Sequence, residues 1–107
     1  MDKKELLNQY KSRAQVGGIY AIKNATLNKW YLDATPDLAA AKNRFQFFGP
    51  TKTKAEQDYK AQNGVGFVFE VLEELKKNEN QTDQDFQADL AMLKEIWLEK
   101  LSGQELY

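Results

Sequence analysis

The stretch VGGIYAIKNATLNKWYLDAT, residues 16–35, constrains the fold of this chain more than any other part of the sequence. It contains two short β-rich runs, residues 19–23 and 29–34, on either side of a polar segment at residues 24–28. Two apolar-biased runs of this length with a short polar connection are typical of a β-hairpin. We therefore expect two antiparallel strands that fold back on one another.

Alternation of side chains along these strands assigns their residues to the two faces of a sheet. Tyr31 and Asp33 share one side of the second strand, and Trp30 and Leu32 share the other. Tyr20 lies in the first strand. Tyrosine is common in strands and packs well on a half-buried sheet, so packing alone can explain Tyr20 and Tyr31. Their pattern leaves a structural and a functional role open.

The second half of the chain predicts one more strand and a long final helix. The strand is the apolar run GFVFEVLEEL, residues 66–75. The helix begins near Thr82 or Asp83, both favourable N-cap residues. Its apolar side chains recur at spacings of three and four, which places them on one face toward a core. These side chains are Phe86, Leu90, Leu93, Trp97 and Leu101.

Three further helices are expected. Residues 3–14 carry an apolar stripe at helical spacing. Residues 38–41 suit a short helix that has Pro36 in its first turn. The sequence TKAE at residues 53–56 resembles a capping box that opens a helix, and Asn-Gly at residues 63–64 would end it.

The predicted order is helix, strand, strand, short helix, helix, strand, helix. The simplest packing is an α+β sandwich, in which a three-stranded, mostly antiparallel sheet is flanked by helices. A chain of 107 residues corresponds to one domain.

The composition excludes several kinds of chemistry. The chain has no cysteine and no histidine, so it can form neither a disulfide nor a thiolate or imidazole metal site. Any acid–base or metal chemistry must use carboxylates, tyrosines or lysines. The absence of cysteine fits a reducing cytoplasm. Residues 1–14 are charged and do not resemble a signal peptide, and no apolar run approaches the ~20 residues that span a bilayer.

Charge is unevenly distributed along the chain. Residues 1–65 hold 11 Lys/Arg and 6 Asp/Glu, a balance of +5, whereas residues 66–107 hold 4 and 10, a balance of −6, which together give the net −1. A basic cluster is expected across the two middle helices. It is either solvent-exposed helix surface or a surface that contacts the phosphate backbone of a nucleic acid. Its members are Lys42, Arg44, Lys52, Lys54 and Lys60.

The aromatic run RFQFFGP, residues 44–50, is too apolar for a free loop. Large aromatic side chains dominate core burial, so Phe45, Phe47 and Phe48 are expected to close the core. The alternative for these three side chains is a partner-binding patch.

The hairpin resembles the signature of the GIY-YIG nuclease family. Residues 18–20 read Gly-Ile-Tyr, and residues 31–33 read Tyr-Leu-Asp where Tyr-Ile-Gly is expected. The run GIYAIKNATLNKWYLDATPDL is similar to the family's flanking pattern, FVFEVLEEL to its third strand and LKEIWLEKL to its final helix. The resemblance implies a nuclease-like domain at residues 17–107. Residues 1–16 would be an N-terminal helical extension of the kind found in some bacterial members.

The family implies hydrolysis of phosphodiester bonds in DNA. This reaction needs an activated water, a cation beside the phosphoryl oxygens and a divalent metal that stabilises the leaving oxygen. In the family, the two signature tyrosines line the site. An arginine on the helix after the second strand binds phosphate, and a histidine or tyrosine often follows one turn later. A glutamate on a later helix holds the metal.

When the family's site residues are carried over by position, Tyr20 and Tyr31 match the two signature tyrosines and are candidate catalytic residues. The other site residues of the family are replaced in this chain. The arginine position falls on Ala41, its companion on Phe45, and the metal-binding glutamate on Lys94. An alanine cannot bind phosphate, and a lysine repels a divalent cation.

Nearby residues offer two substitutes for the lost groups. Arg44 lies about one helical turn beyond Ala41, whereas Glu95 is turned about 100° around the helix from Lys94. Catalysis would require both substitutes to take the place of the lost groups. We therefore expect an impaired or inactive site with no bound cofactor. If the site is active, Glu95 or Asp33 would hold one Mg²⁺ or Mn²⁺, although a lone carboxylate is a poor ligand set.

Three functions remain open from the sequence. The first is a nuclease-like domain that has lost hydrolysis and is retained to bind DNA through its basic surface, or to bind a protein. The second is an active, metal-dependent endonuclease with a rearranged site. The third is an interaction module that uses the Phe45–Phe48 run. None of the three involves a membrane, and the oligomeric state is left open.

Overall fold

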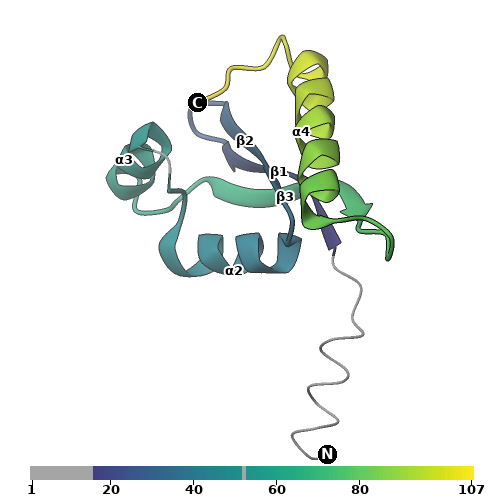
Figure 1. Cartoon of the computed structure of the whole chain (residues 1–107). Coiled ribbons are helices and arrows are strands. Elements are labelled where there is room, and N and C mark those ends of the chain that lie inside the picture. Colours follow the sequence, from purple (N-terminus) through teal and green to yellow (C-terminus); the bar gives the residue numbers. More distant parts are fainter. Residues whose placement is uncertain (1–15, 52) are drawn as a thin grey trace, which may run out of the picture.

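A three-stranded antiparallel sheet forms the centre of the molecule (Figure 1). The computed structural model describes residues 16–51 and 53–107, so the predicted helix at residues 3–14 lies outside the described residues. The strands are β1 (Val16–Asn24), β2 (Lys29–Thr35) and β3 (Phe67–Lys76), arranged in the order β2-β1-β3. The predicted three-stranded sheet is confirmed.

The hairpin of β1 and β2 pairs as predicted. Its register places Tyr20 opposite Asp33 and Ile22 opposite Tyr31. The Asn24 side-chain oxygen accepts the backbone N–H groups of Thr26 and Leu27, which closes the start of the turn. Short polar side chains commonly fix turns in this way.

The two faces of the sheet carry different cores. One face, here called the tyrosine face, contains Tyr20, Ile22 and Tyr31, which pack with side chains of the helices after β2. The other, here called the α4 face, contains Ile19, Ala21 and Leu32 under the final helix. The alternation of side chains predicted for the hairpin therefore separates two cores.

Helix α4 (Asp83–Lys100) crosses the α4 face and contacts β1 and β2. Thr82 is its N-cap, and Thr82 and Asp85 form a reciprocal capping box. The predicted apolar stripe faces the sheet, with Phe86 and Leu90 fully buried and the other members partly buried. Both the start and the orientation of the predicted helix are confirmed.

Helices α2 (Leu38–Phe48) and α3 (Thr53–Ala61) cover the tyrosine face, below and to the left of the sheet in Figure 1. Helix α2 is longer than predicted and continues through the aromatic run. Asp37 caps it by accepting the N–H of Ala40, so Pro36 precedes the cap and does not lie in the first turn.

The prediction that all three phenylalanines of this run close the core is wrong for two of them. Phe45 is half-buried and packs against Tyr59 and Phe69. Phe47 is 82% exposed and Phe48 is 75% exposed. Of the three, only Phe45 projects from α2 toward the core of the tyrosine face.

Gly18 of the Gly-Ile-Tyr sequence is required by the backbone. Its φ is +153°, and a Cβ atom at this position would lie 2.0 Å from the carbonyl oxygen of Glu73. The register between β1 and β3 shifts beside this contact, between Ile19 and Tyr20. The glycine thus permits the close approach of two strands at a β-bulge.

The ends of the described chain are tied into the sheet. Val16, predicted as the last residue of an extension, pairs with Lys76 and belongs to β1. Tyr107 donates its backbone N–H to Trp30 and its hydroxyl to Asp58 of α3. Among the described residues, no helix is both long and apolar enough to cross a membrane.

Candidate functional site

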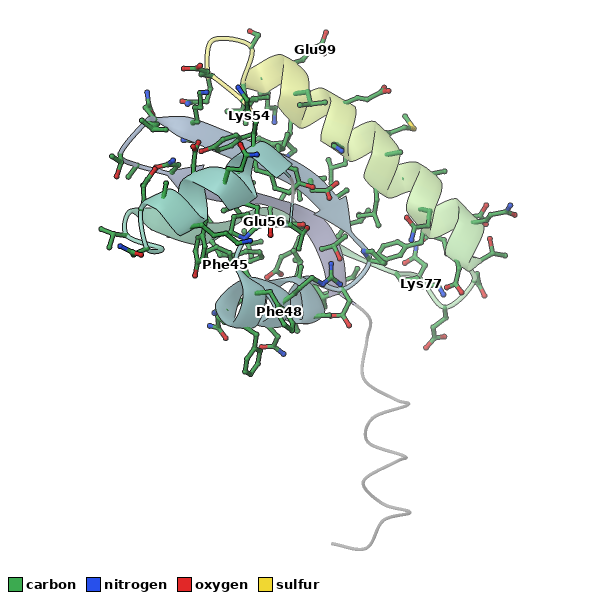
Figure 2. All side chains as sticks on the ribbon, turned by 90° about the vertical axis from the view of Figure 1, so that its left-hand side faces the viewer. Phe45, Phe48, Lys54, Glu56, Lys77 and Glu99 are labelled. Atoms are coloured by element: carbon green, nitrogen blue, oxygen red, sulfur yellow. The ribbon has the colours of Figure 1, made fainter. Side chains whose placement is uncertain are left out.

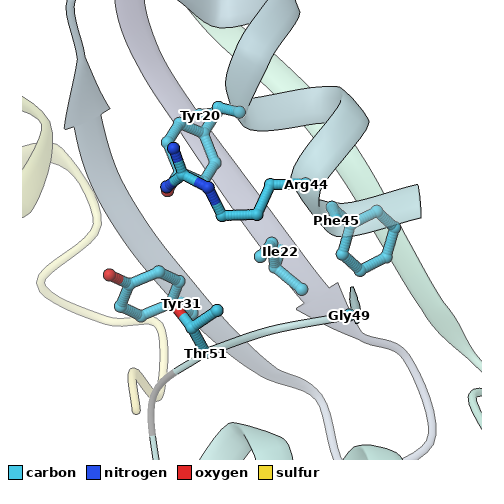
Figure 3. A pocket seen from close by; sticks show the side chains of 8 residues that line it. Tyr20, Ile22, Tyr31, Arg44, Phe45, Gly49 and Thr51 are labelled. Atoms are coloured by element: carbon cyan, nitrogen blue, oxygen red, sulfur yellow. The ribbon is translucent and has the colours of Figure 1, made fainter. Parts of the chain in front are cut away.

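A shallow pocket opens on the tyrosine face, between the hairpin and the C-terminal half of α2 (Figure 3). Its empty space, counted together with open solvent, amounts to about 260 Å³. Residues from β1, β2, α2 and the segment after α2 line it. They are Tyr20, Ile22, Tyr31, Ala41, Arg44, Phe45, Gly49 and Thr51.

Tyr20 and Tyr31 form one wall of this pocket. They lie on adjacent strands on the same face, and their rings meet edge-on with centroids 6.4 Å apart. The Tyr20 ring also stacks on Phe69 of β3, with a centroid distance of 4.9 Å. The two signature tyrosines therefore line one pocket from adjacent strands.

Both tyrosine hydroxyls are held in the neutral form. Burial raises the pKa of Tyr20 to about 12, the nearby Asp33 carboxylate adds to this rise, and Arg44 opposes it. Burial also raises the pKa of Tyr31, and its hydrogen bond to Asp33 raises it further. A hydroxyl in this state donates a hydrogen bond at neutral pH and is not available as a tyrosinate.

The Asp33 carboxylate, at the end of the hairpin, is fully engaged by its neighbours. Its Oδ2 accepts the Tyr31 hydroxyl at 2.8 Å, and its Oδ1 accepts the backbone N–H of Ala34 at 2.8 Å. Lys94 of α4 reaches around β2 and places its Nζ 3.2 Å from the same Oδ1. Burial alone would raise the pKa of Asp33, but these three donors outweigh it, and the pKa is lowered. Asp33 is therefore an anion at neutral pH.

Arg44 brings a cation to the pocket from α2. Its guanidinium extends over the hydroxyl end of Tyr20 in Figure 3, consistent with its electrostatic effect on that tyrosine. Among the described residues, none forms an ion pair or a hydrogen bond with the side chain of Arg44. Ala41, one turn earlier, is 5% exposed and packs in the core.

The structure was compared with solved structures of other proteins. It superimposes on the catalytic domain of the intron endonuclease I-TevI, in a glutamate-to-alanine mutant, with a TM-score of 0.56 and 22% sequence identity. The superposition covers 81% of this chain and 84% of that one. The chain has the GIY-YIG fold. No family model matches the sequence, and no curated protein matches it significantly.

The metal position of the GIY-YIG family can be tested against this fold. The position that the resemblance assigns to the metal-binding glutamate holds Lys94, whose ammonium contacts Asp33. A divalent ion next to Asp33 would have to displace that ammonium and would be repelled by it. Glu95, the suggested substitute, is exposed on α4 and does not line the pocket. The described residues contain no group of three carboxylates that could hold a metal ion. The side chains around Asp33 and Lys94 therefore do not fit a divalent metal.

The predicted basic cluster is distributed over both helices of the tyrosine face. Lys42 and Arg44 are two residues apart on α2, so they project about 200° apart around its axis. Lys54 is exposed on α3, and Lys60 is paired with Glu56 at 3.1 Å. Lys52 lies outside the described residues. Of the described members of the cluster, Arg44 lines the pocket.

Sequence reasoning missed the segment that follows α2. Gly49 and Thr51 line the pocket, and Pro50 between them is fully buried. Gly49 has a φ of +69°, and Tyr59 lies close enough to exclude a side chain there. The Gly-Pro pair marks a turn, and it was the available signal that the chain reverses direction beside the tyrosines.

Proposed function

We propose that this protein is a nucleic-acid-binding domain on a nuclease fold, and that it does not hydrolyse phosphodiester bonds. The observation that carries the proposal is the ion pair of Lys94 with Asp33 at the position of the family's metal ligand. The side chains at this site do not suit the divalent cation of the reaction, whereas Arg44 brings to the pocket a cation that can hold phosphate.

Arg44 supplies the binding part of this proposal. A guanidinium donates parallel hydrogen bonds to phosphate oxygens, and this one has no described ion-pair partner. Tyr20, beside it, is neutral and can donate a hydrogen bond from its hydroxyl. This arrangement suits a nucleic-acid phosphate at the mouth of the pocket.

The loss of hydrolysis follows from what the pocket lacks. A metal ion in such a reaction polarises the phosphoryl oxygens and lowers the pKa of an attacking water. Neutral tyrosines hold no divalent cation, and Lys94 opposes one. Removing a single preorganised electrostatic partner costs ~10²–10³ in rate, so loss of the metal leaves little catalysis.

The proposal is tested by measuring binding and cleavage on the same labelled DNA. Fluorescence anisotropy should show binding that persists in EDTA and weakens steeply with added salt, because phosphate contacts release counterions. Arg44→Gln should weaken this binding about tenfold, as expected for loss of a charge-assisted contact. Lys100→Gln, which removes an exposed cation from α4, is the matched control and should have little effect.

Cleavage of the same DNA separates the alternatives. With Mg²⁺ or Mn²⁺, plasmid and branched DNA should remain intact on denaturing gels. Metal-dependent nicking that is abolished by Tyr20→Phe or Glu95→Ala would instead support an active endonuclease with a rearranged site. Absence of any nucleic-acid binding would overturn the proposal and favour a protein partner.

A further inference from the structure

The end of α2 exposes two aromatic rings that neither core explains. Phe47 and Phe48 are the most exposed large apolar side chains among the described residues. Their ring centroids lie 6.4 Å apart and their planes are inclined by 50°, so neither ring covers the other. Each ring therefore keeps apolar surface in contact with water, which is unfavourable unless a ligand covers it.

These rings stand next to the cation of the pocket. Phe47 and Phe48 follow Arg44 by three and four residues, so all three side chains lie on one flank of α2. Figure 2 shows Phe48 on this helix and Phe45 where α2 meets α3. We call the three residues Arg44, Phe47 and Phe48 the α2 platform.

The surroundings of the platform distinguish between possible occupants. Residues 38–48 contain no acidic side chain and hold two cations, Lys42 and Arg44. Asp33 of β2 is paired with Lys94, and Glu56 of α3 is paired with Lys60. Asn43 and Gln46 are exposed on the side of α2 next to Phe47, so polar groups border the two rings and limit the apolar patch. Protein-binding patches on monomers are larger and contiguous.

We infer that the α2 platform binds unpaired bases of single-stranded nucleic acid, which stack on Phe47 and Phe48 while Arg44 holds the adjacent phosphate. Cations along a groove combined with aromatic rings are how proteins bind single strands without reading their sequence. In a duplex the base faces are covered by neighbouring bases, so exposed rings distinguish single from double strands. This inference rests on the proposed function and names the form of nucleic acid that the site takes.

The test compares a labelled oligothymidylate with a blunt duplex of the same strand length, by fluorescence anisotropy. The wild-type chain should bind the single strand at least tenfold more tightly. The double variant Phe47→Ala/Phe48→Ala should lose about 10–100-fold in affinity for the single strand, in line with measured base–aromatic stacking, and less than threefold for the duplex. Both side chains are exposed, so the variant should keep the circular dichroism spectrum of the wild type.

Two further variants identify stacking as the cause. Phe47→Leu/Phe48→Leu keeps the apolar surface without the rings and should lose nearly as much affinity as the alanine pair. Met92→Ala, an exposed apolar side chain on α4, should leave affinity unchanged. The phenylalanine variants should also keep the salt dependence of the wild type, whereas Arg44→Gln should reduce its slope by about 0.7 per lost contact.

The outcomes separate this inference from the proposed function. Equal affinity for both probes, unaffected by the phenylalanine variants, would overturn the inference and leave the proposed function intact. A change of oligomeric state in the alanine pair, seen by sedimentation without a change in DNA affinity, would show a protein contact and also overturn it. If the wild type binds neither probe, both proposals fail.

Discussion

The two faces of the sheet are built from alternate residues of the same strands, yet they differ in closure and polarity. On the α4 face, Ile19 and Ala21 are completely buried beneath one long helix. On the tyrosine face, two shorter helices leave a pocket between Tyr20 and Arg44. The α4 face therefore holds the most completely buried strand side chains, whereas the tyrosine face leaves the Arg44 side chain available to a ligand.

Among the substitutions that distinguish the two faces, the largest loss of folding stability is expected at Phe86. This fully buried ring lies against the backbone of Gly17 beneath α4. Phe86→Ala should lower the free energy of unfolding by about 3–5 kcal/mol, because it removes a large buried ring and leaves a cavity. Urea denaturation measures the loss, with the exposed Met92→Ala on the same helix as control. A loss below about 1 kcal/mol would mean that α4 does not hold the main core.

Gly18 tests whether the signature glycine is structural. Gly18→Ala should destabilise the domain by about 1–3 kcal/mol or more, because the added methyl group meets the backbone of Glu73. Gly103→Ala is the matched control, since nothing lies within 4 Å of the position that a Cβ atom would take there. If both variants unfold at the same urea concentration as the wild type, the close approach of β1 and β3 is absent in solution.

The titration of Tyr20 sharpens the description of the pocket. Its folded-state pKa of about 12 exceeds the ordinary value of 10.0, first because of burial and then because of Asp33. The resulting stabilisation is present below pH 10 and is lost as pH rises from about 10 to about 12. Tyrosinate absorbance should therefore show a late transition that Tyr20→Phe reduces. A transition of this tyrosine near neutral pH would instead indicate an activated hydroxyl.

The smallest change in folding stability is expected at the ion pair of Asp33 with Lys94. The lowered pKa of Asp33 in the folded state contributes stability above the ordinary value of 3.8, and this is lost as pH falls through the folded-state pKa. Both side chains are partly exposed, so Lys94→Gln should cost only about 0.5 kcal/mol at pH 7. The variant should lose less stability than the wild type on acidification, measured as the shift of the urea midpoint. Identical shifts would show that the pair does not form.

The sequence predicted the parts of this fold that depend on local patterns. Alternation identified the hairpin and its two faces, and the spacing from Phe86 to Leu101 identified the buried side of α4. Aromatic content could not say where a helix leaves the core, so Phe47 and Phe48 were assigned to the wrong environment.

The candidate site depends on contacts that no local pattern carries. Asp33 and Lys94 are 61 residues apart, and their pairing requires α4 to lie across the hairpin. The position of Arg44 in the pocket depends on α2 continuing beyond its predicted end. The residue types therefore indicate that the arginine and the glutamate of the family are replaced. Only the fold shows that Arg44 and Asp33 lie beside the tyrosines.

If our proposal holds, the pocket binds nucleic acid without a metal and without cutting it. The most direct measurement is the anisotropy of a labelled DNA strand with the wild-type chain, followed over time in EDTA and then in Mn²⁺. We expect the same affinity in both conditions and an anisotropy that stays constant after Mn²⁺ is added. Binding that requires Mn²⁺, or a steady fall in anisotropy as the strand is cut, would contradict it.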